Sequence, residues 1–394
     1  MVRNSALAFI VLMGIVSLFS DMTHEGARSI YGAYLGLAGA SAAVIGFVSG
    51  LGEFIGYSFR IVTGYIADRL KNYWFLSIAG YVVNMLAIPL LALIPENGWK
   101  YACILIVLER MGKAIRQPSK NTLVSFAATQ VGEGKAFAIQ EFLDQIGAFC
   151  GPLLLFIIML ITKGDDLFFV YRICFLVLLI PACLTIFFLL RAKRKFPHPE
   201  LFETESDTDE KFKINTPFFI YITAISLFAF GFLDFPLITM HVAKKAVISE
   251  TFLPLLYAGA MFVDAFAALA WGWMYDKYGI IVLALSVFLS SFFSIFIFQY
   301  HSVASICVGV LLWGIGMGAQ ESILKSMVTH LVQKKSRSTG FGIFETSFGI
   351  CWFAGSWTLG ILYDYSIAWM IAVSVLTQLA ALPLLFVLVK RYKL

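Results

Sequence analysis

The sequence predicts an all-α integral membrane protein made of two pseudo-symmetric six-helix bundles, and three observations carry this prediction. Apolar residue types make up 60% of the 394 residues, against about 45–50% in soluble proteins. Charged types make up only 13%, about half the usual share. The apolar residues also form continuous runs near the roughly 20 residues that a membrane-spanning helix needs. Lipid is therefore the expected solvent for most of the chain.

The same composition excludes several classes of protein. A disordered chain, a secreted disulfide scaffold and most soluble enzyme folds cannot accommodate this much apolar surface. A transmembrane barrel would alternate apolar and polar residues. The six cysteines lie inside apolar runs without a CxxC pair, so we expect buried hydrophobic residues, no metal site and no cofactor. The net charge of +5 comes from residues at the ends of the apolar runs, so no nucleic-acid partner is expected.

Twelve apolar runs are long enough to be predicted as spanning helices. The first run is longer than a signal peptide and lacks a small-residue cleavage site, so we expect it to remain as a helix. The predicted helices are 5–36, 43–67, 73–94, 101–128, 135–162, 167–190, 216–246, 251–275, 280–300, 303–331, 339–363 and 367–389.

The distribution of Lys and Arg predicts the orientation of these helices. If the N-terminus is cytoplasmic, most Lys and Arg residues outside the helices face the cytoplasm, and only Lys100, Lys163, Lys244 and Lys245 face outward. Positive charge stays on the cytoplasmic side of membrane proteins. We therefore expect both termini in the cytoplasm and a multi-pass protein of a bacterial inner membrane.

One long hydrophilic stretch divides the chain. Residues 191–216 begin with RAKRK and continue through an acidic run, a composition typical of a solvated linker. The expected domains are a six-helix bundle at 1–190, a cytoplasmic linker at 191–216 and a second six-helix bundle at 217–394.

The two halves contain the same motif. GYIADRL at 64–70 and GWMYDKYG at 272–279 both read Gly-x-x-x-Asp followed by a basic residue. A second match, at nearly the same offset, relates 112–151 to 316–355. Together they indicate parallel duplication of a six-helix unit, an arrangement that in transporters places the site at the midplane between the halves. The motif residues are Gly64, Asp68, Arg69, Gly272, Asp276 and Lys277.

The first of these loops resembles the signature loop of the major facilitator superfamily. Gly147-x-x-x-Gly151-Pro152 in the fifth helix resembles the antiporter motif of that family, although the trailing glycines are missing. The resemblance implies a twelve-helix transporter that moves a small solute by alternating access, and we expect a monomer.

Asp68 gives the signature loop a physical role. A carboxylate at a helix C-terminus is unfavourably placed in the field of that helix. In the family such a residue contacts a helix N-terminus or a basic residue across the interface, and breaking this contact would make it a conformational latch. The alternative is a basic loop that only sets the topology.

The first helix carries four ionisable residues on one face. Asp21, His24, Glu25 and Arg28 have the spacing i, i+3, i+4, i+7. Burial and mutual repulsion predict that the two carboxylates hold one proton between them, which suits proton coupling, with His24 as a shuttle. A polar face neutralised internally is the alternative, and a metal site at His24 is a weaker one.

Other charged residues inside the apolar helices are also candidates for proton coupling or substrate binding. Each costs about 2.5–3.5 kcal/mol at the bilayer centre, so a functional reason for its presence is expected. Further proton-coupling candidates are Glu53, Asp234 and Asp264. The substrate-binding candidates are Arg28, Arg60, Lys113, Arg116 and Asp144, of which Arg116 offers a bidentate fork for an anionic group.

Helices four and five are expected to form ion pairs with each other across their hairpin. Counting from a turn near Val131 matches Lys120 with Glu141 and Arg116 with Asp144. In the second half the same count matches Lys325 with Glu345. These pairs either break during a transport cycle or permanently neutralise the cost of burial. In the fourth helix itself, Glu109 is expected to pair with Lys113.

These features predict a secondary active transporter rather than an enzyme, since GxSxG, HExxH and GxxxxGK[ST] are all missing from the sequence. The expected partners are protons, a small solute and the lipid bilayer. Export of an organic or amphipathic compound is the leading interpretation. Proton-coupled uptake of an organic anion, and a transporter-like sensor or scaffold without transport, are the alternatives.

Overall fold

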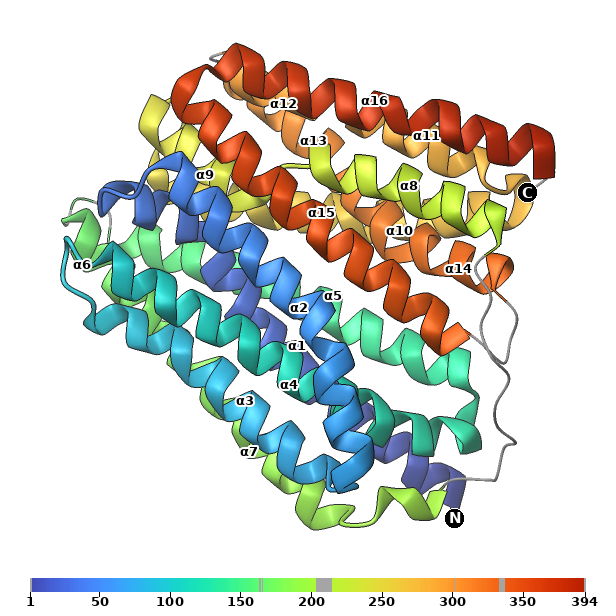
Figure 1. The fold of residues 1–394 in the computed structure, drawn as a ribbon. Helices are drawn as coiled ribbons and strands as arrows, with labels where there is room; N and C mark the ends of the chain where they lie inside the picture. Colours follow the sequence, from blue (N-terminus) through green and yellow to red (C-terminus); the bar gives the residue numbers. More distant parts are fainter. Residues whose placement is uncertain are drawn as a thin grey trace. The chain divides into compact units, whose positions relative to one another are not determined.

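A computed structural model describes residues 2–162, 164, 166–202, 215–300, 302–332 and 337–392, and every regular element in these ranges is a helix (Figure 1). The α-helices are α1 Val2–Leu37, α2 Ala42–Leu70, α3 Tyr73–Leu90, α4 Trp99–Val131, α5 Glu133–Ile161, α6 Leu167–Val177, α7 Leu179–Lys195, α8 Thr216–Gly231, α9 Phe235–Lys245, α10 Leu253–Tyr278, α11 Ile281–Ser290, α12 Phe293–Phe298, α13 Val303–Ala319, α14 Lys325–Leu331, α15 Arg337–Tyr365 and α16 Ile367–Tyr392. Short 3₁₀ turns lie at Leu91–Leu93, Pro199–Phe202 and Glu250–Phe252, and a π-helical turn lies at Gln320–Leu324.

The helical fold class is confirmed, and each of the twelve predicted segments coincides with one helix or with consecutive helices. Within the described residues, ten spans are long and apolar enough to cross a membrane. The α4 and α15 helices do not belong to this set. α4 has a dense charge pattern along its middle, between Glu109 and Lys120. That charge is concentrated at the site described below.

The predicted helix 216–246 is interrupted in its middle. α8 ends at Gly231, and α9 begins after Asp234, whose side chain accepts the backbone N–H of Phe235 at 2.9 Å. The freed carbonyl of Gly231 accepts Gln378 Nε2 at 3.0 Å, and that of Leu233 accepts an indole N–H. Broken helices persist at membrane depth when protein groups satisfy the backbone in this way.

The chain divides into two compact units. Unit 1 consists of Met1–Ile30 and Phe59–Asp207, and unit 2 consists of Tyr31–Ser58 and Thr208–Leu394. The second part of α1 and the first part of α2 thus belong to the unit that contains the second half of the chain. The domain boundaries at 190 and 217 remain a prediction.

Equivalent close contacts occur inside the two units. A Cβ atom on Gly151 of α5 would collide with the carbonyl of Met22 on α1. A Cβ atom on Gly355 of α15 would collide in the same way with the carbonyl of Phe230 on α8. Both glycines belong to the internal match found in the sequence, so the repeat preserves the places where two helices need close approach.

Candidate functional site

Unit 1 gathers the charges of α1, α4 and α5 into one buried network. On α1, the His24 side chain is fully buried, while Asp21 keeps 21% and Glu25 13% of its side-chain exposure. Arg28 Nη1 lies 3.7 Å from Glu25 Oε2. The face predicted from spacing therefore exists, and its carboxylates are the more accessible members.

Through His24, the charged face of α1 contacts a carboxylate of α4. His24 Nδ1 lies 2.8 Å from Glu109 Oε1, and both side chains are fully buried. Asn84 of α3 donates its Nδ2 to the same Glu109 oxygen at 2.5 Å and to the Glu109 backbone carbonyl at 2.9 Å. Arg110 Nε lies 3.6 Å from the other carboxylate oxygen. The expected pairing of Glu109 with Lys113 is replaced by these contacts, because the Glu109 carboxylate faces α1 and α3.

Arg116 is held from three sides. Its Nη2 donates to Ser20 Oγ at 2.9 Å and lies 4.0 Å from Asp21 Oδ1, while the guanidinium stacks over the Tyr81 ring at 4.2 Å. Only 2% of the side chain is exposed. The guanidinium of Arg116 is therefore already in contact with Ser20, Asp21 and Tyr81.

The predicted pairing of Lys120 with Glu141 is wrong in register. Lys120 Nζ lies 3.8 Å from Asp144 Oδ2 and donates to Ser17 Oγ. The hairpin turns at Gly132, which has a positive φ of 105° and lies midway between Lys120 and Asp144 in the sequence. The prediction centred the hairpin on Val131, one residue before the actual turn, and therefore matched Lys120 with a residue too close to the turn.

Glu141 and Arg116 change partners as a consequence. Glu141 is exposed and accepts Gln145 Nε2 at 3.4 Å. Arg116, expected opposite Asp144, lies instead against Asp21. Lys113 is half-buried on the same helix.

Small residues of α5 allow these helices to approach closely. A Cβ atom on Gly147 would collide with the Leu18 carbonyl of α1, as one on Gly151 does with Met22. Pro152 lies inside α5, one residue after this contact. The motif that resembles the antiporter signature is thus a packing surface that positions α1.

The remaining coupling and binding candidates belong to α2, α9 and α10. Glu53 belongs to the part of α2 in unit 2, where Asp234 caps α9 and Asp264 is buried on α10. Arg60 lies half-buried on the part of α2 in unit 1. The structure brings the candidates of α1, α4 and α5 together inside unit 1.

The gating candidates are described only in part. A Cβ atom on Gly64 would meet the Pro118 side chain at ordinary contact distance, and Arg69 and Lys277 are exposed. The Gly272 position is open to a Cβ atom, and Glu345 is half-buried. The side chains predicted to complete the latches and the second ion pair lie outside the described residues; they are those of Asp68, Asp276 and Lys325.

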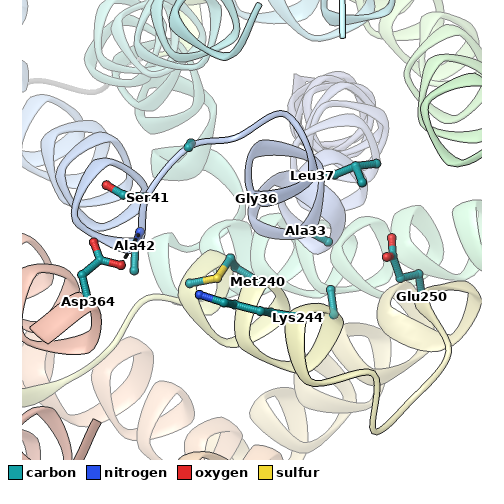
Figure 2. Close-up of a pocket in the computed structure, with 11 residues that line it drawn as sticks. Ala33, Gly36, Leu37, Ser41, Ala42, Met240, Lys244, Glu250 and Asp364 are labelled. Atoms are coloured by element: carbon teal, nitrogen blue, oxygen red, sulfur yellow. Dashed lines mark hydrogen bonds between the residues drawn. The ribbon is translucent and has the colours of Figure 1, made fainter. Parts of the chain in front are cut away.

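Unit 2 contains a pocket of about 340 Å³ at one end of α1, α2, α9 and α15 (Figure 2). Lys244, Glu250 and Asp364 give it charge, and Met240 and Leu37 give it an apolar wall. Asp364 reaches from α15 to the first turn of α2, where it accepts the backbone N–H groups of Ala42 at 3.2 Å and Ala43 at 2.8 Å.

Two of these features escaped the sequence reasoning. Glu109 and Asn84 come together only through the packing of α3 on α4, which local spacing does not encode. Asp364 lies at the end of an apolar segment. Acidic residues are common at such ends, so the sequence did not single it out. In the part of the chain that the structure describes, no group of three metal-binding side chains is assembled.

The family model and the relatives that match this chain agree on one protein family. The sequence profile of the Major Facilitator Superfamily matches residues 5–245 and 220–393. An uncharacterized protein of Mycobacterium tuberculosis is 36% identical over 390 residues, covering 97% of this chain and 93% of the relative. An uncharacterized MFS-type transporter of Methanocaldococcus jannaschii is 28% identical, covering 91% and 89%.

Solved structures show the same fold. The nucleoside transporter NupG superposes with a TM-score of 0.77 at 12% identity, covering 95% of this chain and 99% of that one. A D-xylose-proton symporter gives a TM-score of 0.70 at 14% identity, covering 97% of each chain. At such low identity the likeness shows the fold alone.

Proposed function

The chain belongs to the major facilitator superfamily, a family of membrane transporters rather than enzymes, and from this premise we propose that it is a proton-coupled secondary transporter. It works as a monomer by alternating access, with both termini in the cytoplasm of a bacterial cell. The small solute and the proton share the site in unit 1. Export of an organic or amphipathic compound is the favoured direction.

One observation carries the proton coupling. Asp21 and Glu25 lie one turn apart on α1, partly exposed, and each has a buried arginine at 4.0 Å or less. Desolvation and mutual repulsion favour the neutral form of a carboxyl group, whereas the arginines favour the ionised form. A small change in these distances therefore moves a proton on or off, and coupling requires such a difference between two conformations.

The site also supports substrate recognition by charge. Asp21, Glu25 and Asp144 are its accessible carboxylates, and Lys113 is its half-buried ammonium group. Carboxylates on the accessible side favour a substrate with a cationic group, as in export of an amphipathic base. Lys113 supports the second candidate, uptake of an organic anion.

With both termini in the cytoplasm, the pocket of Figure 2 lies at the outer end of unit 2. We assign it to the outer gate. The hydrogen bonds of Asp364 join α15 to α2 across this gate, so outward opening has to break them.

The test begins with purified protein. A thermal-stability screen against a nucleoside, a dipeptide, D-xylose and amphipathic amines identifies a stabilising probe. That probe is then followed in proteoliposomes with an imposed pH gradient. Asp21→Asn and Glu25→Gln are expected to abolish gradient-driven accumulation while sparing exchange, and Glu96→Gln, an exposed loop variant, is the control. Full accumulation by both site variants would remove α1 as the coupling site.

A further inference from the structure

Glu109 is the most deeply buried carboxylate of the unit 1 network. Its side chain has no solvent exposure, and its Oε1 receives Asn84 Nδ2 and lies 2.8 Å from His24 Nδ1. Within the part of the chain that the structure describes, its Oε2 accepts no hydrogen bond and has Arg110 Nε at 3.6 Å. An ionised carboxylate in such a place is costly unless it is fully paired and hydrogen-bonded, so the contacts of Glu109 decide how well its charge is stabilised.

His24 lies between this carboxylate and the accessible one. Its Nδ1 lies 2.8 Å from Glu109 Oε1 and its Nε2 lies 3.6 Å from Glu25 Oε1. Neither nitrogen makes a hydrogen bond within the described residues, so each transfer needs a small movement of the imidazole ring or of its partner. The Glu25 side chain is 13% exposed, whereas the other two are fully buried. The three groups therefore form a line from the accessible face to the interior of the unit.

We propose that Glu109 stores the coupling proton and that His24 carries it between Glu25 and Glu109, an inference that rests on the proposed proton coupling. In the loading step, Nε2 accepts the proton of the Glu25 carboxyl group while Nδ1 releases its proton to the Glu109 carboxylate. Glu25 ends ionised and Glu109 neutral, and His24 is neutral before and after with its proton on the other nitrogen. The reverse transfer restores the original tautomer, so atoms and charge balance.

The surrounding cations control which end of the line holds the proton. Arg28 pairs with Glu25, and Arg110 lies against Glu109. A positive charge on His24 would be fully buried, and Arg28 and Arg110 already lie against the two carboxylates that face it. A concerted transfer that avoids the imidazolium is therefore favoured over one that passes through it.

Asn84 is the positioning residue of this relay. Its amide bonds both the Glu109 carboxylate and the Glu109 backbone carbonyl, which fixes the carboxylate against His24. Glu109, in contrast, is proposed to carry the proton itself.

The experiment uses purified full-length protein in lipid vesicles and needs no substrate. Infrared difference spectra after a pH jump report the C=O stretching band of a protonated carboxyl group. Wild type is expected to lose a band on going to high pH, and Glu109→Gln is expected to lack that band, whereas Glu96→Gln retains it. Glu109→Asp, which keeps a carboxyl group, is expected to shift the band rather than remove it.

A second variant separates a relay from a structural role. His24→Gln is expected to retain the Glu109 band but to slow its exchange with D₂O by about a hundredfold, the low end of what a positioned proton-transfer group contributes. A Glu109→Gln spectrum identical to wild type, or exchange in His24→Gln at the wild-type rate, overturns the relay. The proposed function fails separately, when wild type shows no response of transport to a pH gradient.

Discussion

Asp364 gives the most specific prediction about the outer gate. Its carboxylate accepts two N–H groups at the start of α2, at 3.2 and 2.8 Å, from a helix 322 residues away in the sequence. Removing a side-chain cap costs about 0.5–2 kcal/mol. Because Asp364 is exposed, we expect about 1 kcal/mol, which changes a conformational ratio by about fivefold. Asp364→Ala is therefore expected to raise the population in which α2 and α15 separate by that factor.

Spin labels at Val44→Cys on α2 and Tyr365→Cys on α15 measure this separation, since Val44 is only half-buried and Tyr365 is exposed. The exposed native cysteines, Cys183 and Cys307, are first changed to Ser. Wild type is expected to show mainly one distance, and Asp364→Ala a second, longer one.

A matched control comes from unit 1. Asp166 caps its own helix, α6, by accepting the Phe169 N–H at 3.1 Å. Asp166→Ala removes a cap of similar strength without touching α2 or α15, so its distance distribution is expected to match wild type. An unchanged distance distribution in Asp364→Ala, or an equal change in Asp166→Ala, would refute the role of Asp364 at the outer gate.

Three further predictions concern packing and ion pairs. Lys120→Met is expected to lower the free energy of unfolding by about 1–3 kcal/mol because it leaves the carboxylate of Asp144 without its cation. Addition of Asp144→Asn is expected to recover most of this loss in a double-mutant cycle, and additive losses would contradict the ion pair. Gly147→Ala is expected to lower the melting temperature because its Cβ meets the α1 backbone, whereas Gly56→Ala, with open space around it, is the neutral control; equal melting temperatures would contradict the contact. Asp68→Asn is expected to leave insertion intact and slow probe transport in proteoliposomes, and transport at the wild-type rate would remove the latch role.

The positions of the helices could be predicted because continuous apolar runs of spanning length have few alternatives in lipid. The interruption between α8 and α9 was missed, although its signal was present. Asp234 precedes Phe235 and Pro236, and an acidic cap followed by proline near the first turn is a helix start. Apolar composition on both sides of the break concealed this signal.

The candidate site was predictable on one helix and less so between helices. Spacing on α1 correctly placed Asp21, His24, Glu25 and Arg28 on one face. The partners across the α4–α5 hairpin depended on the exact residue of the turn. Moving the turn from Val131 to Gly132 moves the residue opposite Lys120 by two positions, from 142 to Asp144, so Glu141 no longer matches it. Contacts between α1, α3 and α4 depend on tertiary packing, so no local pattern indicated Glu109 as the partner of His24.

The central claim, that the unit 1 network couples a proton to solute movement, is tested most directly in proteoliposomes. The measurement is accumulation of the stabilising probe against its own gradient when only a pH gradient is imposed, in wild type and in Asp21→Asn. Wild type is expected to concentrate the probe, and Asp21→Asn is expected only to equilibrate or exchange it. If wild type does no more than equilibrate the probe, or if Asp21→Asn concentrates it as wild type does, the account is contradicted.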